Sequence, residues 1–122
     1  MRFENKVAVV TGSGQGIGEA YAKAIAREGA SVVIAALNEE QGTRVAAEIS
    51  SAGGNSVFVK TDVSDEGSTT DMGQAAVEAF GGVDYLVNNA AIYQTMKIHA
   101  MVDVPMDYYN HFMAVNMNGA LL

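Results

Sequence analysis

The glycine-rich segment Thr11-Gly-Ser-Gly-Gln-Gly-Ile-Gly18 is the part of this sequence whose residue types and spacing suggest a specific chemistry. Glycines permit a tight turn and a close approach of the backbone to a ligand. A helix that starts in such a loop offers free N–H groups and the positive end of its dipole to a phosphate. The spacing is T-G-x-x-x-G-x-G, through Gly12, Gly16 and Gly18, rather than G-x-G-x-x-G. A flexible turn is the alternative, but a position between a strand and a helix favours dinucleotide binding.

The elements that would position this loop alternate along the chain. Continuous runs of β-branched and other apolar residues predict strands covered on both faces at 6–11 and 31–36. Two further strands are predicted at 55–61 and 83–88. Apolar residues at helical spacing predict helices at 17–28, 38–52 and 64–80, with a last helix after Pro105. This order predicts an α/β fold, a doubly wound parallel sheet of the Rossmann type with right-handed crossovers.

The C-terminal end of this pattern is unusual. A doubly wound sheet normally continues with further strands, whereas this sequence ends in the apolar run Asn118–Leu122. We therefore interpret the fold as incomplete at its C-terminus. Residues 1–122 are expected to form the N-terminal part of a single dinucleotide-binding domain.

Local signals predict several helix ends and one buried face. Asn38 is a suitable N-cap with Gln41 at the capping-box position, and Ser64 is a candidate N-cap for the third helix. Glycines at 29, 53–54 and 81–82 are expected to end the first three helices. The first helix is expected to bury one apolar face, formed by Ile17, Ala20, Tyr21, Ala24 and Ile25. The corresponding residues are Val45, Ala46 and Ile49 in the second helix, and Met72, Ala75, Ala76, Ala79 and Phe80 in the third.

Composition excludes several classes of function. The net charge of −7 and only 7 basic residues argue against binding to a nucleic-acid backbone. The absence of cysteine excludes disulfides and cysteine-based zinc sites, and His99 and His111 lack metal-ligand spacing, so no metal site is predicted. No apolar run is long enough to span a membrane and the N-terminus does not resemble a signal peptide, so we expect a cytoplasmic protein.

Three further motifs accompany the glycine loop in a characteristic order. They are Thr61-Asp62-Val63, Asn88-Asn89-Ala90-Ala91 and Val115-Asn116-Met-Asn-Gly119. Together with Thr11–Gly18 they resemble the cofactor loop, the adenine motif, the N-N-A-G motif and the helix-four motif of the classical short-chain dehydrogenase/reductase family. The resemblance covers nearly the whole chain and corresponds to the first half of a classical member.

The resemblance implies an NAD(P)-dependent oxidoreductase that transfers a hydride between nicotinamide and an alcohol or ketone. In the glycine loop, Gly12, Gln15, Gly16, Ile17 and Gly18 would line the pyrophosphate and the nearby ribose. The adenine would meet Leu37, Asp62 and Val63, although a turn or cap role is the alternative for Asp62. Asn89, Ala90 and Ala91 would lie along the cofactor ribose. Ala91 stands where the family usually has a glycine.

Ala36 departs from the family pattern at the end of the second strand. Members that prefer NAD usually carry an acid at this position, and its absence removes a hydrogen-bond partner of NAD and a repulsion against NADP. No basic residue within Ser13–Gln15 or Leu37–Asn38 would pair with a 2′-phosphate. We therefore expect NAD or NADP as cofactor, with modest affinity for both.

Asn116 is the catalytic residue that the resemblance assigns, through a backbone-bound water in a proton relay; an Asn that kinks a helix is the alternative. The family's catalytic Ser, Tyr and Lys are not expected within residues 1–122. Tyr93-Gln-Thr-Met-Lys97 matches the Tyr-x-x-x-Lys spacing, but it directly follows the Asn88–Ala91 motif, where the family has a loop.

The 122 residues alone are therefore expected to be inactive. The alternative function is a non-catalytic fragment that binds a dinucleotide or associates with a partner. The resemblance also implies a homo-oligomer, a dimer or tetramer, through the last helix, and a small alcohol or ketone as substrate.

Overall fold

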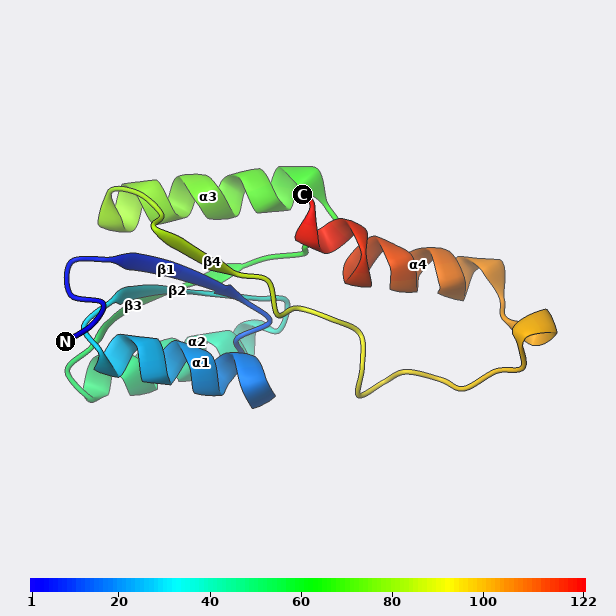
Figure 1. The fold of residues 1–122 in the computed structure, drawn as a ribbon, viewed down its shortest axis with the longest axis horizontal. Coiled ribbons are helices and arrows are strands. Elements are labelled where there is room, and N and C mark those ends of the chain that lie inside the picture. The colour runs from blue at the N-terminus through cyan, green and yellow to red at the C-terminus, as the bar shows by residue number, and fades with distance from the viewer.

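The computed structural model describes residues 1–122 as a parallel sheet with helices on both faces (Figure 1). The strands are β1 (Val7–Thr11), β2 (Ser31–Ala36), β3 (Asn55–Lys60) and β4 (Tyr85–Val87). The helices are α1 (Gly16–Arg27), α2 (Glu39–Ser51), α3 (Glu66–Phe80) and α4 (Met106–Asn116), with short 3₁₀ turns at Met101–Asp103 and Asn118–Ala120. The strand order β3-β2-β1-β4, with every pairing parallel, confirms the predicted α/β fold.

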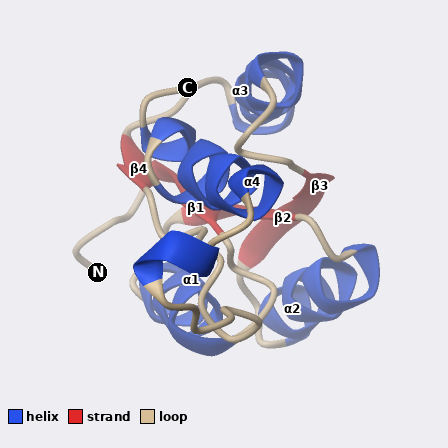
Figure 2. Ribbon diagram, turned by 90° about the vertical axis from the view of Figure 1, so that its right-hand side faces the viewer, coloured by secondary structure: helices blue, strands red, loops and turns tan.

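The two faces of the sheet carry separate apolar clusters. On one face, α1 and α2 pack over Val10, Val32 and Ile34, and on the other face α3 packs over Val9 and Val33. Figure 2 shows the sheet edge-on between these helices. All five residues of β1 are buried, as the continuous apolar run predicted. The helix α4 lies beyond the carboxyl ends of the strands and has no buried residue (Figure 1).

The predicted buried face of α1 is wrong in most of its members. The buried residues are Gly18, Ala22 and Ala26, whereas Ile17 is 66% exposed and Tyr21 50% exposed. Ala20 and Ala24 are also exposed, and only Ile25 packs against the core. Small residues at intervals of four let the helix axis approach the sheet closely. Alanines occur on both faces of the helix, so only the larger Ile17 and Tyr21 distinguish the predicted face from the buried one.

The second and third helices agree better with the predicted faces. Val45, Ala46 and Ile49 are all buried, and in α3 the buried members are Met72 and Ala76. Ala79 is exposed, contrary to the prediction, because it lies near the end of α3 and faces away from the sheet cluster.

The helix caps differ from the predictions in two details. Asn38 does cap α2, since its Oδ1 accepts from the backbone N–H of Gln41 at 2.9 Å. The capping box is not completed, because the Gln41 side chain donates to Gln15 Oε1 at 3.3 Å. The N-cap of α3 is Asp65, which accepts from Ser68 N at 2.8 Å, and not Ser64, whose hydroxyl donates to Asp62.

Candidate cofactor-binding site

The glycine loop has a backbone conformation and a packing that side chains would disturb. Gly12 has φ +65° and Gly16 has φ +58°, values that residues with a Cβ rarely adopt. A Cβ on Gly12 would lie 2.8 Å from the Cα of Ala90. The loop therefore passes directly over the segment that follows β4.

The N-terminus of α1 directly follows this loop. Gln15, the residue before the helix, is extended and makes no side-chain cap hydrogen bond. The first backbone N–H groups of an uncapped helix are free to bind an external anion, with the helix dipole favouring negative charge. The predicted phosphate residues Gln15, Gly16 and Ile17 are all exposed at this point, and Gly18 is buried beneath them.

Thr11 joins the glycine loop to the loop after β4. Its Oγ1 accepts from the backbone N–H groups of Asn89 and Ala90, both at 3.0 Å, and donates to Val87 O at 3.3 Å. The Asn89 side-chain amide returns to the glycine loop, donating to the carbonyls of Thr11 and Gly12 at 3.2 Å. We predicted Asn89 and Ala90 beside the cofactor but gave Thr11 no role. The sequence signal for this role of Thr11 is a hydroxyl at the end of a strand, next to the first glycine of the loop.

Asp62 and Val63 lie at the carboxyl end of β3. The Oδ1 atom of Asp62 accepts from the backbone N–H of Ser64 at 2.9 Å and from its hydroxyl at 2.6 Å. These hydrogen bonds hold the pKa of Asp62 below its ordinary value, so the carboxylate stays ionised. Val63 is buried against Gly119. Asp62 therefore stabilises a turn, which is the alternative role given for it from the sequence. Only one of its two carboxylate oxygens, Oδ1, makes these hydrogen bonds.

Ala36 ends β2 and is buried, and the next residue, Leu37, is 64% exposed. A Cβ on Gly14 would lie 3.3 Å from the Ala36 Cβ, so Ala36 directly borders the glycine loop. In the sheet register Ala36 pairs with Lys60, which is exposed. The sequence alone does not place this basic residue beside Ala36, because Lys60 belongs to the neighbouring strand.

Asn116 is the last residue of α4, and its side chain binds the loop after β4. Its Oδ1 accepts from Ile92 N at 2.7 Å, and its Nδ2 donates to Ile92 O at 3.0 Å. A small cavity of about 60 Å³ brings Asn116 together with Thr11, Val63 and Ala90. Residues from four separate sequence motifs therefore meet at one edge of the sheet. Ala91, which follows Ala90 in the chain, is exposed.

Four charged side chains between α1 and α2, which we call the inter-helix ion network, lie beside the glycine loop. The members are Glu19 and Lys23 in α1 and Arg44 and Glu48 in α2. Hydrogen bonds from Arg44, and then from Lys23, lower the pKa of Glu19 to about 2. The same contacts raise the pKa of Arg44 and of Lys23 above their ordinary values. All four groups are therefore charged at neutral pH.

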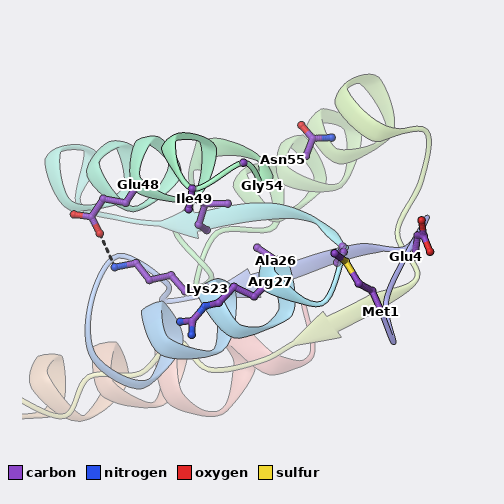
Figure 3. A pocket seen from close by; sticks show the side chains of 13 residues that line it. Met1, Glu4, Lys23, Ala26, Arg27, Glu48, Ile49, Gly54 and Asn55 are labelled. Atoms are coloured by element: carbon purple, nitrogen blue, oxygen red, sulfur yellow. Dashed lines mark hydrogen bonds and ion pairs between the residues drawn. The ribbon is translucent and has the colours of Figure 1, made fainter.

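A cavity lies toward the C-terminal ends of these two helices (Figure 3). It measures about 660 Å³ and is bordered by Lys23 and Glu48 at one end and by Met1 and Glu4 at the other. None of the predicted site residues lines it. The candidate site at the glycine loop is therefore separate from this cavity.

Comparison with known proteins identifies the family of this chain. A family model described as short chain dehydrogenase matches residues 6–122. The chain belongs to the short chain dehydrogenase family. A crystal structure of a short chain dehydrogenase from Mycobacterium avium superposes with a TM-score of 0.90 at 33% identity, covering 98% of this chain and 43% of that one.

Two curated relatives of this family member show how much of an oxidoreductase it spans. An uncharacterized oxidoreductase of Mycobacterium tuberculosis is 56% identical over 120 residues, 98% of this chain and 48% of its own length. The L-rhamnose 1-dehydrogenase (NAD(P)(+)) of Azotobacter vinelandii is 41% identical over 124 residues, 98% of this chain and 47% of its own. The chain thus spans about half the length of the curated relatives it matches.

Tyr93 and Lys97, which match the Tyr-x-x-x-Lys spacing, lie outside the candidate site. Tyr93 is 76% exposed on the irregular segment between β4 and α4, and the backbone N–H of Lys97 donates to the Tyr108 hydroxyl at 2.8 Å. The pair thus occupies a loop, as its place after Asn88–Ala91 indicated. No three His, Asp or Glu side chains are grouped to hold a metal ion, and none of the helices has the length and apolar character of a membrane span.

Proposed function

We propose that residues 1–122 supply the cofactor-binding half of an NAD(P)-dependent oxidoreductase. The observation that carries this proposal is the glycine loop, whose residues Gly12 and Gly18 are packed too closely against Asn89 and Ala90 for any side chain. That packing leaves the free N–H groups of α1 at the carboxyl edge of a parallel sheet, where doubly wound folds bind dinucleotides.

The residues present fit a dinucleotide in each of its parts. Gly12, Gln15, Gly16, Ile17 and Gly18 would hold the pyrophosphate by backbone N–H groups. The exposed Leu37 and the ionised Asp62 would contact the adenine, and Val63 would add backbone contacts. The segment 89–91 would lie along the ribose. When bound, NAD(P) accepts or supplies the hydride, and the protein provides binding and orientation.

The cofactor preference should be weak, because Ala36 offers no carboxylate to the ribose hydroxyls of NAD. Lys60 brings positive charge to the same edge and would favour the 2′-phosphate of NADP. The L-rhamnose 1-dehydrogenase among the relatives carries both cofactors in its name. We expect wild-type dissociation constants for NAD and NADP within about tenfold of each other, a difference of about 1.4 kcal/mol. Fluorescence titration would measure both.

The substitution Ala36→Asp should turn this weak preference into a strong one. The new carboxylate would accept hydrogen bonds from the ribose of NAD and repel the 2′-phosphate, which we expect to favour NAD by about 100-fold. Ala36→Asn is the matched control, since it has a similar size without the charge. A wild-type protein that already prefers NAD by more than 100-fold would contradict the proposed role of Ala36.

We also propose Asn116 as a catalytic residue of the complete enzyme. Its side chain clamps the backbone of Ile92, which leaves its own main-chain carbonyl at the end of α4 as the atom to bind a relay water. Asn116→Ala keeps this carbonyl but removes the side-chain clamp that orients it. The substitution should therefore lower kcat about 100-fold, within the range of acid–base contributions, and leave the Kd of NAD within about threefold. Steady-state kinetics with a secondary alcohol and a cofactor titration would separate the two effects. An unchanged kcat in Asn116→Ala would contradict this role and would make the side-chain contact with Ile92 purely structural.

A second candidate function is dinucleotide binding without catalysis. It is favoured by the positions of Tyr93 and Lys97, which lie on a loop rather than in a buried pair.

We propose a small alcohol or ketone as the substrate of the complete enzyme. We also propose a homo-oligomer that uses α4, where Met106 is 65% and Tyr109 47% exposed. Reduction of NAD by a panel of alcohols discriminates these functions, because a binding module gives titration without turnover.

A further inference from the structure

The inter-helix ion network touches the glycine loop at a single atom. Arg44, which lies 30 residues further along the chain, donates from Nη2 to the carbonyl oxygen of Gly14 at 3.2 Å. The same guanidinium forms a two-pronged contact with Glu19, at 3.1 Å and 3.0 Å, and reaches Glu48 at 3.0 Å. A planar guanidinium held by two carboxylates has little freedom to turn. Its position therefore constrains the Gly14 carbonyl.

We propose that Arg44 is a positioning residue that sets the orientation of the peptide between Gly14 and Gln15 for cofactor binding. The proposal rests on the dinucleotide function proposed above. In a planar trans peptide the C=O of one residue and the N–H of the next point in opposite directions. Holding the Gly14 carbonyl toward α2 therefore turns the Gln15 N–H away from α2. There it joins the free N–H groups at the start of α1.

This peptide requires an external restraint because glycines surround it. Gly14 has no side chain to limit its backbone, and Gly16 on the other side of Gln15 has φ +58°. In a free loop the peptide could rotate, and the Gln15 N–H would lose its direction. The second link to α2, from Gln41 Nε2 to Gln15 Oε1 at 3.3 Å, joins side chains only and makes no hydrogen bond to this peptide.

The network is also built so that Arg44 does not act as a phosphate ligand. Two acids, Glu19 and Glu48, balance two bases, Arg44 and Lys23, so the four groups carry no net charge. With the pKa of Glu19 lowered to about 2, its carboxylate keeps hold of Arg44 at any physiological pH. The effect of Arg44 on cofactor binding should therefore pass through the loop.

Lys23 provides an internal control for this proposal. Its Nζ binds the same two carboxylates, Glu19 at 2.6 Å and Glu48 at 2.5 Å, and the second of these pairs is drawn in Figure 3. All its ion-pair contacts are to these acids, and the glycine loop is held by Arg44. Removing either base leaves one cation for two acids. Only the loss of Arg44 also releases the Gly14 carbonyl.

The test compares Arg44→Met with Lys23→Met in the full-length protein. We expect Arg44→Met to raise the Kd of NAD about tenfold, because the variant loses one charge-assisted hydrogen bond. The KM of NAD should rise by the same factor, and kcat should stay within about twofold of the wild-type value. Lys23→Met should leave the Kd of NAD within about twofold. Thermal unfolding of both variants reports the shared effect on stability.

Two results would overturn the proposal: an unchanged Kd in Arg44→Met, or an equal rise in both variants. Should Arg44→Met not fold, Arg44→Lys and Lys23→Arg keep all four charges and allow the same comparison. We then expect a rise of about threefold in the Kd of Arg44→Lys alone, because the single ammonium nitrogen lacks the planar fork with which the guanidinium spans Glu19, Glu48 and the Gly14 carbonyl. A wild-type protein that binds neither NAD nor NADP refutes the proposed function itself, independently of Arg44.

Discussion

Replacing Gly18 with alanine should nearly abolish cofactor binding. A Cβ at this position would overlap the carbonyl group of Gly12 and the side-chain amide of Asn89. Neither can move without breaking the contact between the glycine loop and the loop after β4, since the Asn89 amide donates to the carbonyls of Thr11 and Gly12. We expect a rise of at least about 100-fold in the Kd of NAD, close to 3 kcal/mol. Overpacking should also lower the free energy of unfolding by about 2–3 kcal/mol.

Gly73 in α3 offers a matched control for this substitution. It is a helical glycine with no atom near its missing Cβ, so alanine there meets open space. Gly73→Ala should raise the free energy of unfolding by about 0.5–1 kcal/mol through helix propensity and leave the Kd of NAD unchanged. Urea unfolding and cofactor titration of both variants provide the comparison. Equal cofactor affinity in Gly18→Ala and Gly73→Ala would refute the close packing of the loop.

The order of the elements could be predicted because each one has a strong local signal. The runs at 7–11 and 31–36 are buried on both faces, so they are continuously apolar and read as strands without alternation. Asn38 was identified as a cap because a cap depends on residues three positions apart. The predicted face of α1 is wrong because the true contact uses the small residues Gly18, Ala22 and Ala26, whereas the prediction follows the larger side chains of Ile17 and Tyr21.

The predicted site residues came from motifs, whereas the contacts that hold them came only from the structure. Thr11 and Asn89 are separated by 78 positions, and Gly14 and Arg44 by 30, so no local pattern indicates that they touch. Lys60 is adjacent to Ala36 only through the register of β2 and β3. Motif reading therefore finds residues that would contact a cofactor. It misses the residues that position them, because those act across strands and between helices.

Thr11 is the positioning residue whose loss should affect stability most. Its hydroxyl is the acceptor for two backbone N–H groups, those of Asn89 and Ala90, and the residue is only 3% exposed. Thr11→Val keeps the shape of the side chain but leaves both N–H groups without an acceptor. At about 1–3 kcal/mol for each unsatisfied group, we expect a loss of about 3 kcal/mol in the free energy of unfolding. Urea unfolding measures this loss.

Thr11→Ser separates the hydroxyl from the methyl group at this position. Serine keeps the acceptor and should lose only about 1 kcal/mol, for the buried methyl alone. Cofactor binding should follow the same order, because releasing Asn89 also frees the carbonyl of Gly12 and with it the turn that brings α1 to the cofactor. Valine and serine variants of equal stability would show that the hydroxyl does not hold the two loops together. The unequal result predicted here would place the junction of β1 and β4 at the centre of the site.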